Sequence, residues 1–455
     1  MKPSKITLQD MLDARERRAR AQEALLKDAP ENACLVSFSL NIAGDVKRTP
    51  KTRLLFDRGL QMFEDLQLPE LHRSITDAHT GTEALLLVQA DAHAVKARTE
   101  RIEDAFPAAR LFDFDVINRS GEKLSRKEPR ACLVCGGAAA VCARSRAHGL
   151  DAVKTATEEL LNDFCADLLG STARKALEQE LYTTPKPGLV DRNNNGAHTD
   201  MNLMLFLKSA LTLEPYCSMA ALLGLKQLRL LADLPDEPIS RELLEFMTED
   251  PLVVFGKQAE RKMFRATNGV NTHKGMIYSM GLLLYGMGKA LTSGGDAIAH
   301  AAAFAERDAE RRLERAREQQ DTNGAKVLAK FGAVGAVGEA VNGFPHAVAC
   351  ADRLAFYTEA GAENPGALAL CDTMAVLEDT NLLHRGGIEG LRFVQTEAAR
   401  IAALPIEARE DALLALDETL IEKNLSPGGS ADMLALAYLL DAWRTMTKDV
   451  WEVRI

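Results

Sequence analysis

Two aspartates separated by a single residue form the first pair in the sequence that could hold a metal ion. Between Phe112 and Val116, apolar residues alternate with Asp113 and Asp115, as in a strand with one buried face. Such side chains leave the same face of a strand, with about 7 Å between their backbone positions. Two carboxylates there suit Mg²⁺ bound to a polyphosphate, because Mg²⁺ takes few protein oxygens and completes its shell with phosphate and water. Two solvated acids on an exposed strand face explain the pattern at least as well.

Cationic side chains that could bind the phosphates occur in the same third of the chain. Arginine offers paired N–H donors that match phosphate oxygens. Arg15 and Arg18 lie three residues apart, so they would share one helix face. Surface arginines are common, and no single one of them is specific. The candidates for substrate binding are Arg15, Arg18, Lys47, Arg53 and Arg126.

Three cysteines and a histidine follow with the spacing of metal ligands. Two residues separate Cys132 from Cys135, six separate Cys135 from Cys142, and five separate Cys142 from His148. The first pair has the spacing of a zinc knuckle, and the other two side chains could complete a tetrahedron. Zinc held in this way would be structural, because four protein ligands leave no open position. A set of reduced cysteines beside an Ala-rich helix is the alternative.

A long loop rich in Pro, Gly and Asn occupies residues 184–201. Such residues enforce an ordered loop between helices, and a loop of this length usually carries function. Its polar candidates are Lys186, Asp191, Arg192, His198 and Asp200.

Four further blocks punctuate the second part of the chain. In residues 267–275, Asn271 or Thr272 can cap the helix that follows, which leaves backbone N–H groups for an anion beside His273 and Lys274. Residues 331–340 are rich in glycine and carry Glu339, and residues 379–387 carry Asp379 and Arg385. In residues 424–432, Ser430 is expected to cap a helix with Asp432 in its first turn, for which a structural role is adequate.

The elements that must position these residues differ between the two parts of the chain. Strand-like segments at Cys34–Leu40, Leu85–Val88 and Leu111–Ile117 alternate with helix-period segments at Leu12–Lys27 and Thr52–Leu66, which predicts an N-terminal α/β (α+β) domain. From about Leu150 the strand signal nearly vanishes and apolar residues recur with the helix period, which predicts a large all-α domain. We expect a multidomain chain with boundaries at residues 1–165 and 166–455. The predicted helices are Asp151–Tyr182, Asn202–Leu213, Met219–Leu231, Arg241–Val253, Pro251–Phe264, Lys274–Leu291, Asp296–Arg317, Pro345–Thr358, Ala367–Leu377 and Ser430–Thr447.

Composition excludes several classes of protein. The 455 residues carry a formal net charge of −10, which argues against a nucleic-acid binder because phosphate backbones need a basic face. The least charged stretch, Met276–Gly288, is too short to span a bilayer, and Met1–Gln22 lacks the apolar segment of a secretory signal. Eight cysteines in a chain of this length do not form a disulfide framework. We therefore expect a cytoplasmic protein with no membrane partner.

The N-terminal motifs resemble those of a known transferase family. The segments are Arg15–Arg18, Leu35–Phe38, Thr52–Arg53, Phe112–Val116, Leu124–Arg126 and Cys132–His148. They are similar to the holo-citrate lyase synthases, also called apo-citrate lyase phosphoribosyl-dephospho-coenzyme A transferases. The resemblance implies that a serine of the acyl-carrier (gamma) subunit of citrate lyase attacks the phosphate next to the ribose of a triphosphoribosyl donor, and that pyrophosphate leaves. Mg²⁺ at Asp113 and Asp115 is our inference from that chemistry.

The C-terminal blocks resemble a second family. Pro-Lys-Pro-Gly-Leu-Val-Asp at 185–191, Gly-Ala-His-Thr-Asp-Met at 196–201, Gly-Val-Asn-Thr-His-Lys-Gly at 269–275 and Ser-Pro-Gly-Gly-Ser-Ala-Asp at 426–432 are similar to the triphosphoribosyl-dephospho-coenzyme A synthases. That resemblance implies that ATP and 3′-dephospho-coenzyme A give 2′-(5″-triphosphoribosyl)-3′-dephospho-coenzyme A and adenine. Val337 departs from the family pattern, which usually has Arg before the Gly-Glu pair at Gly338 and Glu339.

The implied synthase reaction sets the roles that its residues must fill. Adenine leaves poorly unless it is protonated, and the transition state has oxocarbenium character. His198 or His273 could donate the proton, because histidine titrates near neutrality. The candidates for the metal and carboxylate roles are Asp191, Asp200, Glu339 and Asp379. The candidates for binding the triphosphate are Lys186, Arg192, Asn271, Lys274 and Arg385.

Together the two resemblances predict one bifunctional transferase that makes the citrate lyase prosthetic group and attaches it, with Mg²⁺ in both active sites. Prosthetic-group synthesis for malonate decarboxylase is one alternative, although the transferase of that system has a different motif pattern. A zinc-bearing scaffold with an inactive synthase half is another, and it would follow if Val337 signals lost activity.

Overall fold

The computed structural model describes residues 5–226, 250–320, 322–450 and 453–454. The chain divides into two compact units. The described residues of the first are 5–165 and Val450, and those of the second lie between Ala166 and Asp449 and at 453–454. The division falls within helix α5 (Leu150–Tyr182).

The first unit is built on a four-stranded antiparallel sheet with the strand order β2-β3-β1-β4. An antiparallel sheet with helices on its faces is an α+β arrangement, so the α/β alternative is wrong. The strands are β1 (Cys34–Leu40), β2 (Glu70–Ala78), β3 (Gly81–Val88) and β4 (Phe112–Ile117). The helices are α1 (Leu8–Lys27), α2 (Pro50–Glu64), α3 (Ala92–Glu103), the 3₁₀ helix η1 (Pro107–Leu111), α4 (Ala139–Ser145) and the first part of α5.

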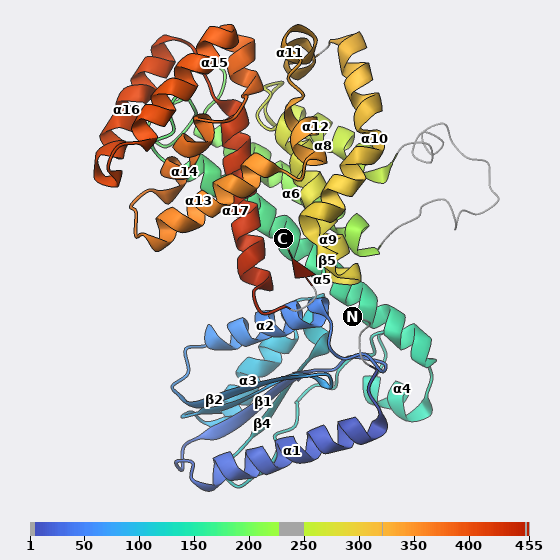
Figure 1. The fold of residues 1–455 in the computed structure, drawn as a ribbon. Helices are drawn as coiled ribbons and strands as arrows, with labels where there is room; N and C mark the ends of the chain where they lie inside the picture. Colours follow the sequence, from blue (N-terminus) through green and yellow to red (C-terminus); the bar gives the residue numbers. More distant parts are fainter. Residues whose placement is uncertain (1–4, 227–249, 321, 451–452, 455) are drawn as a thin grey trace, which may run out of the picture. The chain divides into compact units, whose positions relative to one another are not determined.

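Helices cover both faces of this sheet (Figure 1). On one face α2 and α3 enclose an aromatic core, in which the rings of Phe38 and Phe114 stack with their centroids 4.0 Å apart. On the other face the end of α1 packs Leu26 against Leu35, Leu85 and Leu87. Because side chains alternate along a strand, this division assigns every strand residue to the α2 face or the α1 face.

Side chains from α3 satisfy the outer edge of β4. The backbone N–H of Phe114 donates to the carboxylate of Glu103 at 2.8 Å, and its carbonyl accepts from Lys96 at 3.0 Å. Both side chains are buried. An unpaired strand edge is a template for further strands, so these contacts close the sheet on that side.

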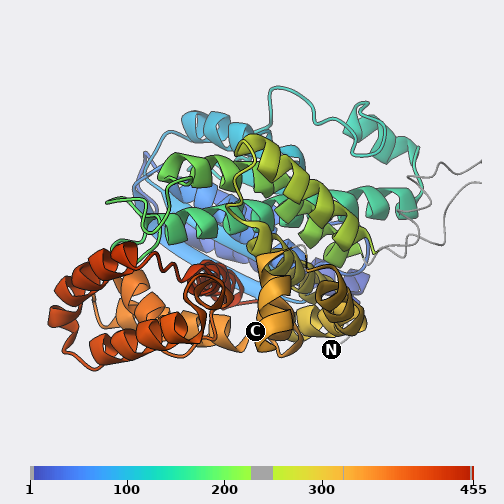
Figure 2. The same ribbon diagram turned by 90° about the horizontal axis from the view of Figure 1, so that it is seen from above.

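The second unit is almost entirely helical, as predicted, apart from the short parallel strands β5 (Gly295–Asp296) and β6 (Val453–Arg454). The helices α6, α8, α9 and α10 pack together, and α13 to α17 form a second group (Figures 1 and 2). Besides the second part of α5 they are α6 (Leu203–Lys226), α8 (Pro251–Ala266), α9 (Lys274–Ser293), α10 (Ala297–Gln319), α11 (Asn323–Phe331), α12 (Gly335–Val341), α13 (Pro345–Glu359), α14 (Pro365–Met374), α15 (Thr380–Ala402), α16 (Ile406–Glu422) and α17 (Gly428–Thr447).

Several predicted helix boundaries differ from those observed. The predicted helices Asn202–Leu213 and Met219–Leu231 form the single helix α6, which continues through Pro215. Residues 227–231 and most of the predicted helix Arg241–Val253 lie outside the described residues. Within the described part of the chain, no helix is both long and apolar enough to cross a membrane. The cytoplasmic location stays a prediction.

Glycines allow α6 and α9 to approach closely. A Cβ added at Gly288 would lie 2.1 Å from the carbonyl oxygen of Ala221, and one added at Gly224 would lie 2.1 Å from that of Tyr285. Neither carbonyl can move without displacing a helix backbone. The two glycines therefore set the distance between these helices.

We expect Gly288→Ala to lower the free energy of unfolding by about 1–3 kcal/mol, because the added methyl group overpacks a backbone contact. Urea denaturation followed by circular dichroism measures the change. Gly324→Ala is the matched control, because Gly324 in α11 has nothing within 4 Å of an added Cβ. Equal stability of the two variants would show that the α6–α9 contact is not tight.

Candidate active sites

One row of polar side chains crosses the sheet of the first unit on the α1 face. The strand register places Glu83 opposite Ser39, and Ser39 opposite Asp113. Ser37 lies opposite Asp115 in the same way. Leu85 and Leu87 belong to the α1 face, so Glu83, two residues before Leu85, belongs to it as well.

Helix α1 supplies a cation to this row. The guanidinium of Arg18 lies 3.5 Å from the hydroxyl of Ser39 and 3.4 Å from the carboxylate of Glu83. Burial raises the pKa of Glu83, and the positive charges of Arg18 and Arg17 oppose that rise. Sequence reasoning missed Glu83, because only the pairing of three strands brings it level with Asp113.

Asp113 and Asp115 lie on β4 with the alternation that was predicted. Phe112, Phe114 and Val116 are fully buried, whereas the two aspartates are partly exposed. Each carboxylate has a cationic neighbour. Arg130 lies 3.7 Å from Asp113, and Lys123 lies 2.5 Å from Asp115. The acids share one face of the strand, but their role as metal ligands stays a prediction.

Arg15 and Lys47 are a second pair of cations near the start of β3. The pKa of Lys47 is lowered by burial and by the positive charge of Arg15. Gly81 lies beside Lys47, because a Cβ added there would be 3.7 Å from that of Lys47. Two cations that repel each other suit an anion such as phosphate, which would relieve the repulsion.

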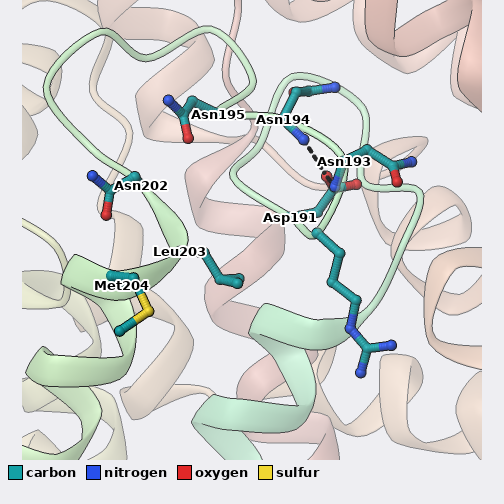
Figure 3. A pocket seen from close by; sticks show the side chains of 8 residues that line it. Asp191, Asn193, Asn194, Asn195, Asn202, Leu203 and Met204 are labelled. Atoms are coloured by element: carbon teal, nitrogen blue, oxygen red, sulfur yellow. Dashed lines mark hydrogen bonds between the residues drawn. The ribbon is translucent and has the colours of Figure 1, made fainter.

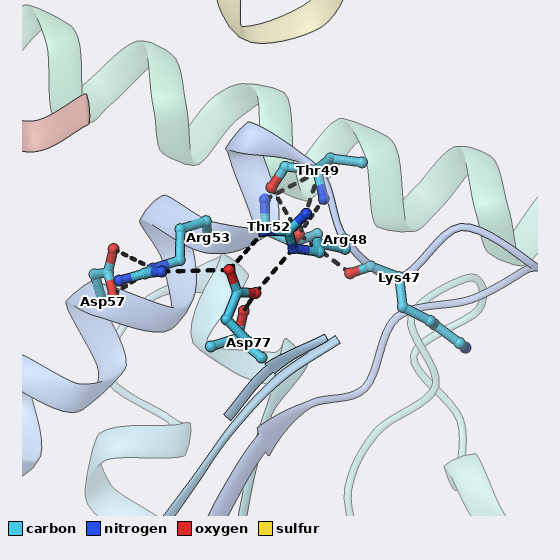
Figure 4. A network of polar contacts seen from close by, with 8 residues as sticks. Lys47, Arg48, Thr49, Thr52, Arg53, Asp57 and Asp77 are labelled. Atoms are coloured by element: carbon cyan, nitrogen blue, oxygen red, sulfur yellow. Dashed lines mark hydrogen bonds and ion pairs between the residues drawn. The ribbon is translucent and has the colours of Figure 1, made fainter. Parts of the chain in front are cut away.

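Arg53 lies elsewhere, on the α2 face of the sheet. Thr82 is two residues before the buried Ala84 of that face, and its hydroxyl donates to Asp77 at 2.9 Å. Arg53 pairs with Asp77 at 3.7 Å and with Asp57 at 2.9 Å. Figure 4 shows this network, with the side chain of Lys47 directed away from it. The structure therefore does not bring Arg53 to Asp113.

Arg126 joins the contacts at the outer edge of β4. It pairs with Glu103 at 2.7 Å and with Asp104 at 2.6 Å. Glu103 also pairs with Arg130 at 2.7 Å, and Arg130 reaches Asp113. The structure therefore connects Arg126 to Asp113 through Glu103 and Arg130.

The four predicted metal ligands gather in one place. The ligand atoms of Cys132, Cys135, Cys142 and His148 all lie within 4.8 Å of one another. The sulfurs of Cys135 and Cys142 are 3.6 Å apart, close to the roughly 3.8 Å that a tetrahedron with Zn–S bonds of about 2.3 Å requires. The Nε2 atom of His148 is buried without a hydrogen-bond partner among the described residues. This geometry fits Zn²⁺.

The backbone around these ligands favours a thiolate. The backbone N–H groups of Cys135 and Val134 lower the pKa of Cys132 to about 6. The pKa of Cys142 rises to about 11, because its thiol contacts that of Cys135 and is partly desolvated. All eight cysteines are free. A metal ion would add a positive charge that all three thiolates could share.

In the second unit, five titratable side chains form a group that we term the central cluster. Lys186 and Glu180 are both buried and form an ion pair. The positive charge of Lys186 also acts on His273, and the negative charges of Asp379 and Glu180 act on Asp432. The central cluster comprises Glu180, Lys186, His273, Asp379 and Asp432.

Asp379 joins two helix starts within this cluster. One of its oxygens accepts from the backbone N–H groups of Asn381 at 2.9 Å and Leu382 at 3.3 Å, which caps α15. The other accepts from the backbone N–H and the hydroxyl of Ser430 in α17, at 2.8 and 3.0 Å. The N-cap of α17 is Pro427, so the prediction that Ser430 caps this helix is wrong. Its hydroxyl instead donates to Asp379.

The two predicted proton donors are both unfavourable for that role. Burial and the positive charge of Lys186 lower the pKa of His273 to about 3, and its Nδ1 lies 2.7 Å from the hydroxyl of Ser209. Burial and the charge of Arg385 lower the pKa of His198, and Asp200 opposes this shift. A histidine that is neutral at physiological pH is a weak proton donor to a leaving group.

His198 belongs to a contact between three of the sequence blocks. Its Nδ1 accepts from Arg385 at 3.1 Å, and its Nε2 lies 2.8 Å from the hydroxyl of Ser426. Arg385 also donates to the side chain of Asn424 at 2.8 Å. Asp200 is exposed and lies 3.9 Å from His198. These contacts hold together the loop at 184–201, residues 379–387 and residues 424–432.

Asp191 organises the loop from within. Its carboxylate accepts from the backbone N–H groups of Lys186 at 3.1 Å, Asn193 at 2.7 Å and Asn194 at 3.1 Å. Asp417, which sequence reasoning missed, accepts from Gly188 at 2.8 Å and from the side chain of Asn194 at 2.7 Å. The loop is therefore an ordered structure.

A cavity of about 260 Å³ opens beside this loop (Figure 3). Its walls come from the loop and from the start of α6, where Leu203 and Met204 lie. Arg192 lines it and stacks over the ring of Tyr182, with 4.8 Å to the centroid. The cavity is smaller than most ligand pockets, which occupy about 300–1,000 Å³, so it suits one part of a large substrate.

The remaining candidates of the second unit lie in separate contacts. Asn271 accepts from the backbone N–H of Lys274 at 3.1 Å, and Lys274 pairs with Glu260 at 2.6 Å. Glu339 in α12 contacts the ring Nδ1 of His346. Val337 precedes it on the same helix and is partly buried.

The N-termini of α9, α15 and α17 meet at the central cluster. A Cβ added at Gly275, the second residue of α9, would lie 3.1 Å from Asp432 of α17. A Cβ added at Gly429 would lie 3.0 Å from Asp379, which caps α15. Helix N-termini carry unpaired N–H groups and a partial positive charge, so their meeting point can bind a polyanion.

Comparison with known proteins agrees with this two-part organisation. Residues 166–449 match the family described as CitG, ATP:dephospho-CoA triphosphoribosyl transferase. Residues 6–164 match the family described as CitX, apo-citrate lyase phosphoribosyl-dephospho-CoA transferase. Fold and motif blocks thus define a two-domain transferase.

Relatives from three bacteria match the whole chain or its helical part. Protein CitXG of Haemophilus influenzae is 34% identical over 467 residues, which cover 97% of each chain. Protein CitXG of Leuconostoc mesenteroides subsp. cremoris is 30% identical over 469 residues, covering 96% of this chain and 97% of the relative. The 2-(5″-triphosphoribosyl)-3′-dephosphocoenzyme-A synthase of Haemophilus ducreyi is 35% identical over 328 residues, covering 67% of this chain and 97% of the relative. The chain belongs to the CitG family and carries a CitX domain ahead of it, as a fusion of the two transferases.

We expect Asp379→Ala to lower the free energy of unfolding by about 2–4 kcal/mol, because it removes a helix cap and leaves the buried N–H of Ser430 without a partner. Thermal unfolding of the purified variant measures the effect. Asp200→Ala is the control, since Asp200 is exposed, and it should change stability by less than about 0.5 kcal/mol. If Asp379→Ala were as stable as the control, Asp379 would not be holding the two helices together.

Proposed function

We propose that the helical unit converts ATP and 3′-dephospho-coenzyme A to 2′-(5″-triphosphoribosyl)-3′-dephospho-coenzyme A and adenine. The N-terminal unit then transfers the phosphoribosyl-dephospho-coenzyme A group to a serine of the acyl-carrier (gamma) subunit of citrate lyase, with release of pyrophosphate. The observation that carries this proposal is the meeting of distant sequence blocks at the central cluster, together with the match to both families. The proposal assigns the synthase to residues 166–455 and the transferase to residues 1–165.

In the helical unit, the meeting of the N-termini of α9, α15 and α17 supports binding of the triphosphate. Lys274 lies at the start of α9 and is partly exposed, so its ammonium group can reach a phosphate. Lys186 is buried against Glu180 and is better suited to balancing charge within the site. The cavity beside Arg192 is suited to a part of the dephospho-coenzyme A or ATP molecule.

In the N-terminal unit, the cations of the α1 face support binding of the sugar triphosphate. Arg15 and Lys47 repel each other in the absence of an anion, and Arg18 lies over the row that contains Glu83. Displacement at a phosphate requires stabilisation of charge on its oxygens and on the leaving group. The cations of this face can supply it.

Mg²⁺ is proposed for both reactions as a complex with the triphosphate. Mg²⁺ keeps several waters and phosphate oxygens and needs only one or two protein carboxylates. Asp113 and Asp115 are the candidates in the first unit. When bound, the ion would neutralise charge that develops on the leaving oxygens.

The match of residues 6–164 to the CitX family favours citrate lyase over malonate decarboxylase as the system served. Synthase activity itself decides between the enzyme and the scaffold alternative. An enzyme releases adenine from ATP only when dephospho-coenzyme A is present, whereas a scaffold releases none.

We expect Asp113→Asn and Asp115→Asn to reduce attachment at least 100-fold, because each removes a charge from the predicted metal site. Adenine release should stay at the level of the unmodified chain. Mass spectrometry of the acyl-carrier subunit, after incubation with ATP, Mg²⁺ and dephospho-coenzyme A, measures attachment as a mass increase equal to phosphoribosyl-dephospho-coenzyme A.

Asp57→Asn is the matched control for this experiment. Asp57 lies on the α2 face in the network with Arg53, and its replacement should leave attachment unchanged. Full attachment by both β4 variants would overturn the metal assignment. An unmodified carrier together with unchanged ATP, from correctly folded protein, would overturn the proposed function.

We also propose that Cys132, Cys135, Cys142 and His148 hold a structural Zn²⁺. The purified chain should contain about one zinc per molecule by elemental mass spectrometry, because four ligands complete a tetrahedral shell. Cys135→Ser should lose the metal and destabilise the first unit. Cys34→Ser is the control, because Cys34 is buried in β1 and is not part of the cluster. Zinc bound equally by both variants would rule the site out.

A further inference from the structure

We infer that Asp432 is the catalytic acid of the synthase site and gives its proton to the departing adenine. This inference rests on the proposed function of the helical unit. It follows from the position of Asp432 where the N-termini of α9, α15 and α17 meet, and from the absence of protein partners for its carboxyl group among the described residues.

The position of Asp432 is defined by close contacts. Its Oδ2 atom lies 3.1 Å from where a Cβ at Gly275 would be, so the carboxyl group lies directly against the first turn of α9. Ser430, two residues earlier, is bonded to Asp379 at the start of α15. Asp432 is therefore held where the starts of α9, α15 and α17 meet.

Asp432 differs from the other acids of the central cluster in being free. Asp379 uses both of its oxygens for hydrogen bonds, and Glu180 is paired with Lys186. In the described part of the chain, no hydrogen bond or ion pair engages Asp432, and its carboxyl group is buried although the residue as a whole is partly exposed. An unpaired carboxyl group can meet a substrate atom, which the other two cannot do without breaking existing contacts.

The charged groups that face Asp432 keep its proton in place. They are Asp379 at the start of α15 and Glu180 on α5, while Gly275 of α9 lies directly against the carboxyl group. Burial and these two negative charges raise the pKa of Asp432 well above its ordinary value. Lys186 is engaged with Glu180. The carboxyl group thus stays protonated at pH values where an ordinary aspartate is ionised.

The two histidines of this region cannot serve in its place. His273 has its pKa lowered to about 3, and the pKa of His198 is also lowered. A general acid must carry its proton at the working pH. Opposite pKa shifts within one site indicate which group is the acid. Here the pKa of Asp432 is raised, whereas the pKa values of both histidines are lowered.

The chemical step balances with one proton donated and one released. The bond between the anomeric carbon of ATP and N9 of adenine breaks, and a bond from the same carbon to the 2′-oxygen of dephospho-coenzyme A forms. Asp432 protonates a ring nitrogen, so the electron pair of the broken bond leaves on neutral adenine. The proton lost by the hydroxyl passes to solvent, and Asp432 takes up a proton from solvent in turn, which restores its carboxyl group.

Asp432→Asn should release adenine from ATP about 10²–10⁴-fold more slowly, the usual contribution of a general acid. The decisive comparison uses 7-methyl-ATP, whose base carries a fixed positive charge and leaves without protonation. With this substrate the variant should lose less than about threefold relative to the unmodified chain. An equal loss with both substrates, or no loss with ATP, would overturn the inference.

The pH profile tests the same claim without a variant. With ATP, kcat/KM of the unmodified chain should fall as pH rises through the pKa of Asp432, because the carboxyl group loses its proton. With 7-methyl-ATP this fall should be absent. A fall of equal size with both substrates contradicts the role of Asp432 as acid.

Asp441→Asn is the matched control, because Asp441 lies on the same helix, α17, away from its N-terminus. It should keep the activity and the pH profile of the unmodified chain. Circular dichroism of both variants checks folding. Failure of the unmodified chain to release adenine would overturn the proposed function and this inference together. Release by the unmodified chain with no defect in Asp432→Asn would overturn the inference alone.

Discussion

The carboxylate of Asp379 is the contact on which the arrangement of the helical unit depends. It caps α15 with one oxygen and holds Ser430 of α17 with the other. A buried ionised group is stable only when its hydrogen bonds are satisfied, and these bonds require both helix starts to lie beside it. The same requirement places Asp432 near the first turn of α9. One buried acid thereby positions a second acid that remains available for chemistry.

The two units offer different physical solutions to binding a sugar triphosphate. In the first unit, Arg18 of α1 faces Glu83, which projects from the sheet, so charge is supplied by side chains. In the helical unit, glycines at 275 and 429 allow helix starts to approach, so backbone N–H groups supply much of the positive potential. Side-chain cations are strongly screened when exposed, whereas N–H groups in a buried site keep their strength.

Sequence patterns predicted elements with a clear periodicity and missed those without one. The strand Cys34–Leu40 has the predicted bounds, because its apolar residues form a continuous buried run. Strand β2 was missed because its residues are almost all exposed and show no alternation. Glycine- and proline-rich blocks drew attention to Asp379. Glu180 was missed, because a single acid within a long helical segment is usually solvated, and only the folded chain brings Lys186 to it.

The contacts of Glu103 link the sheet of the first unit to its arginines. Its carboxylate accepts from the backbone of β4 and at the same time pairs with Arg126 and Arg130. Glu103 therefore has two structural roles: it satisfies the edge of β4, and it positions two arginines. A replacement of Glu103 that preserves its bond to β4 would still have to preserve its ion pairs with the two arginines. Homologues are expected to change Glu103 only together with its arginine partners.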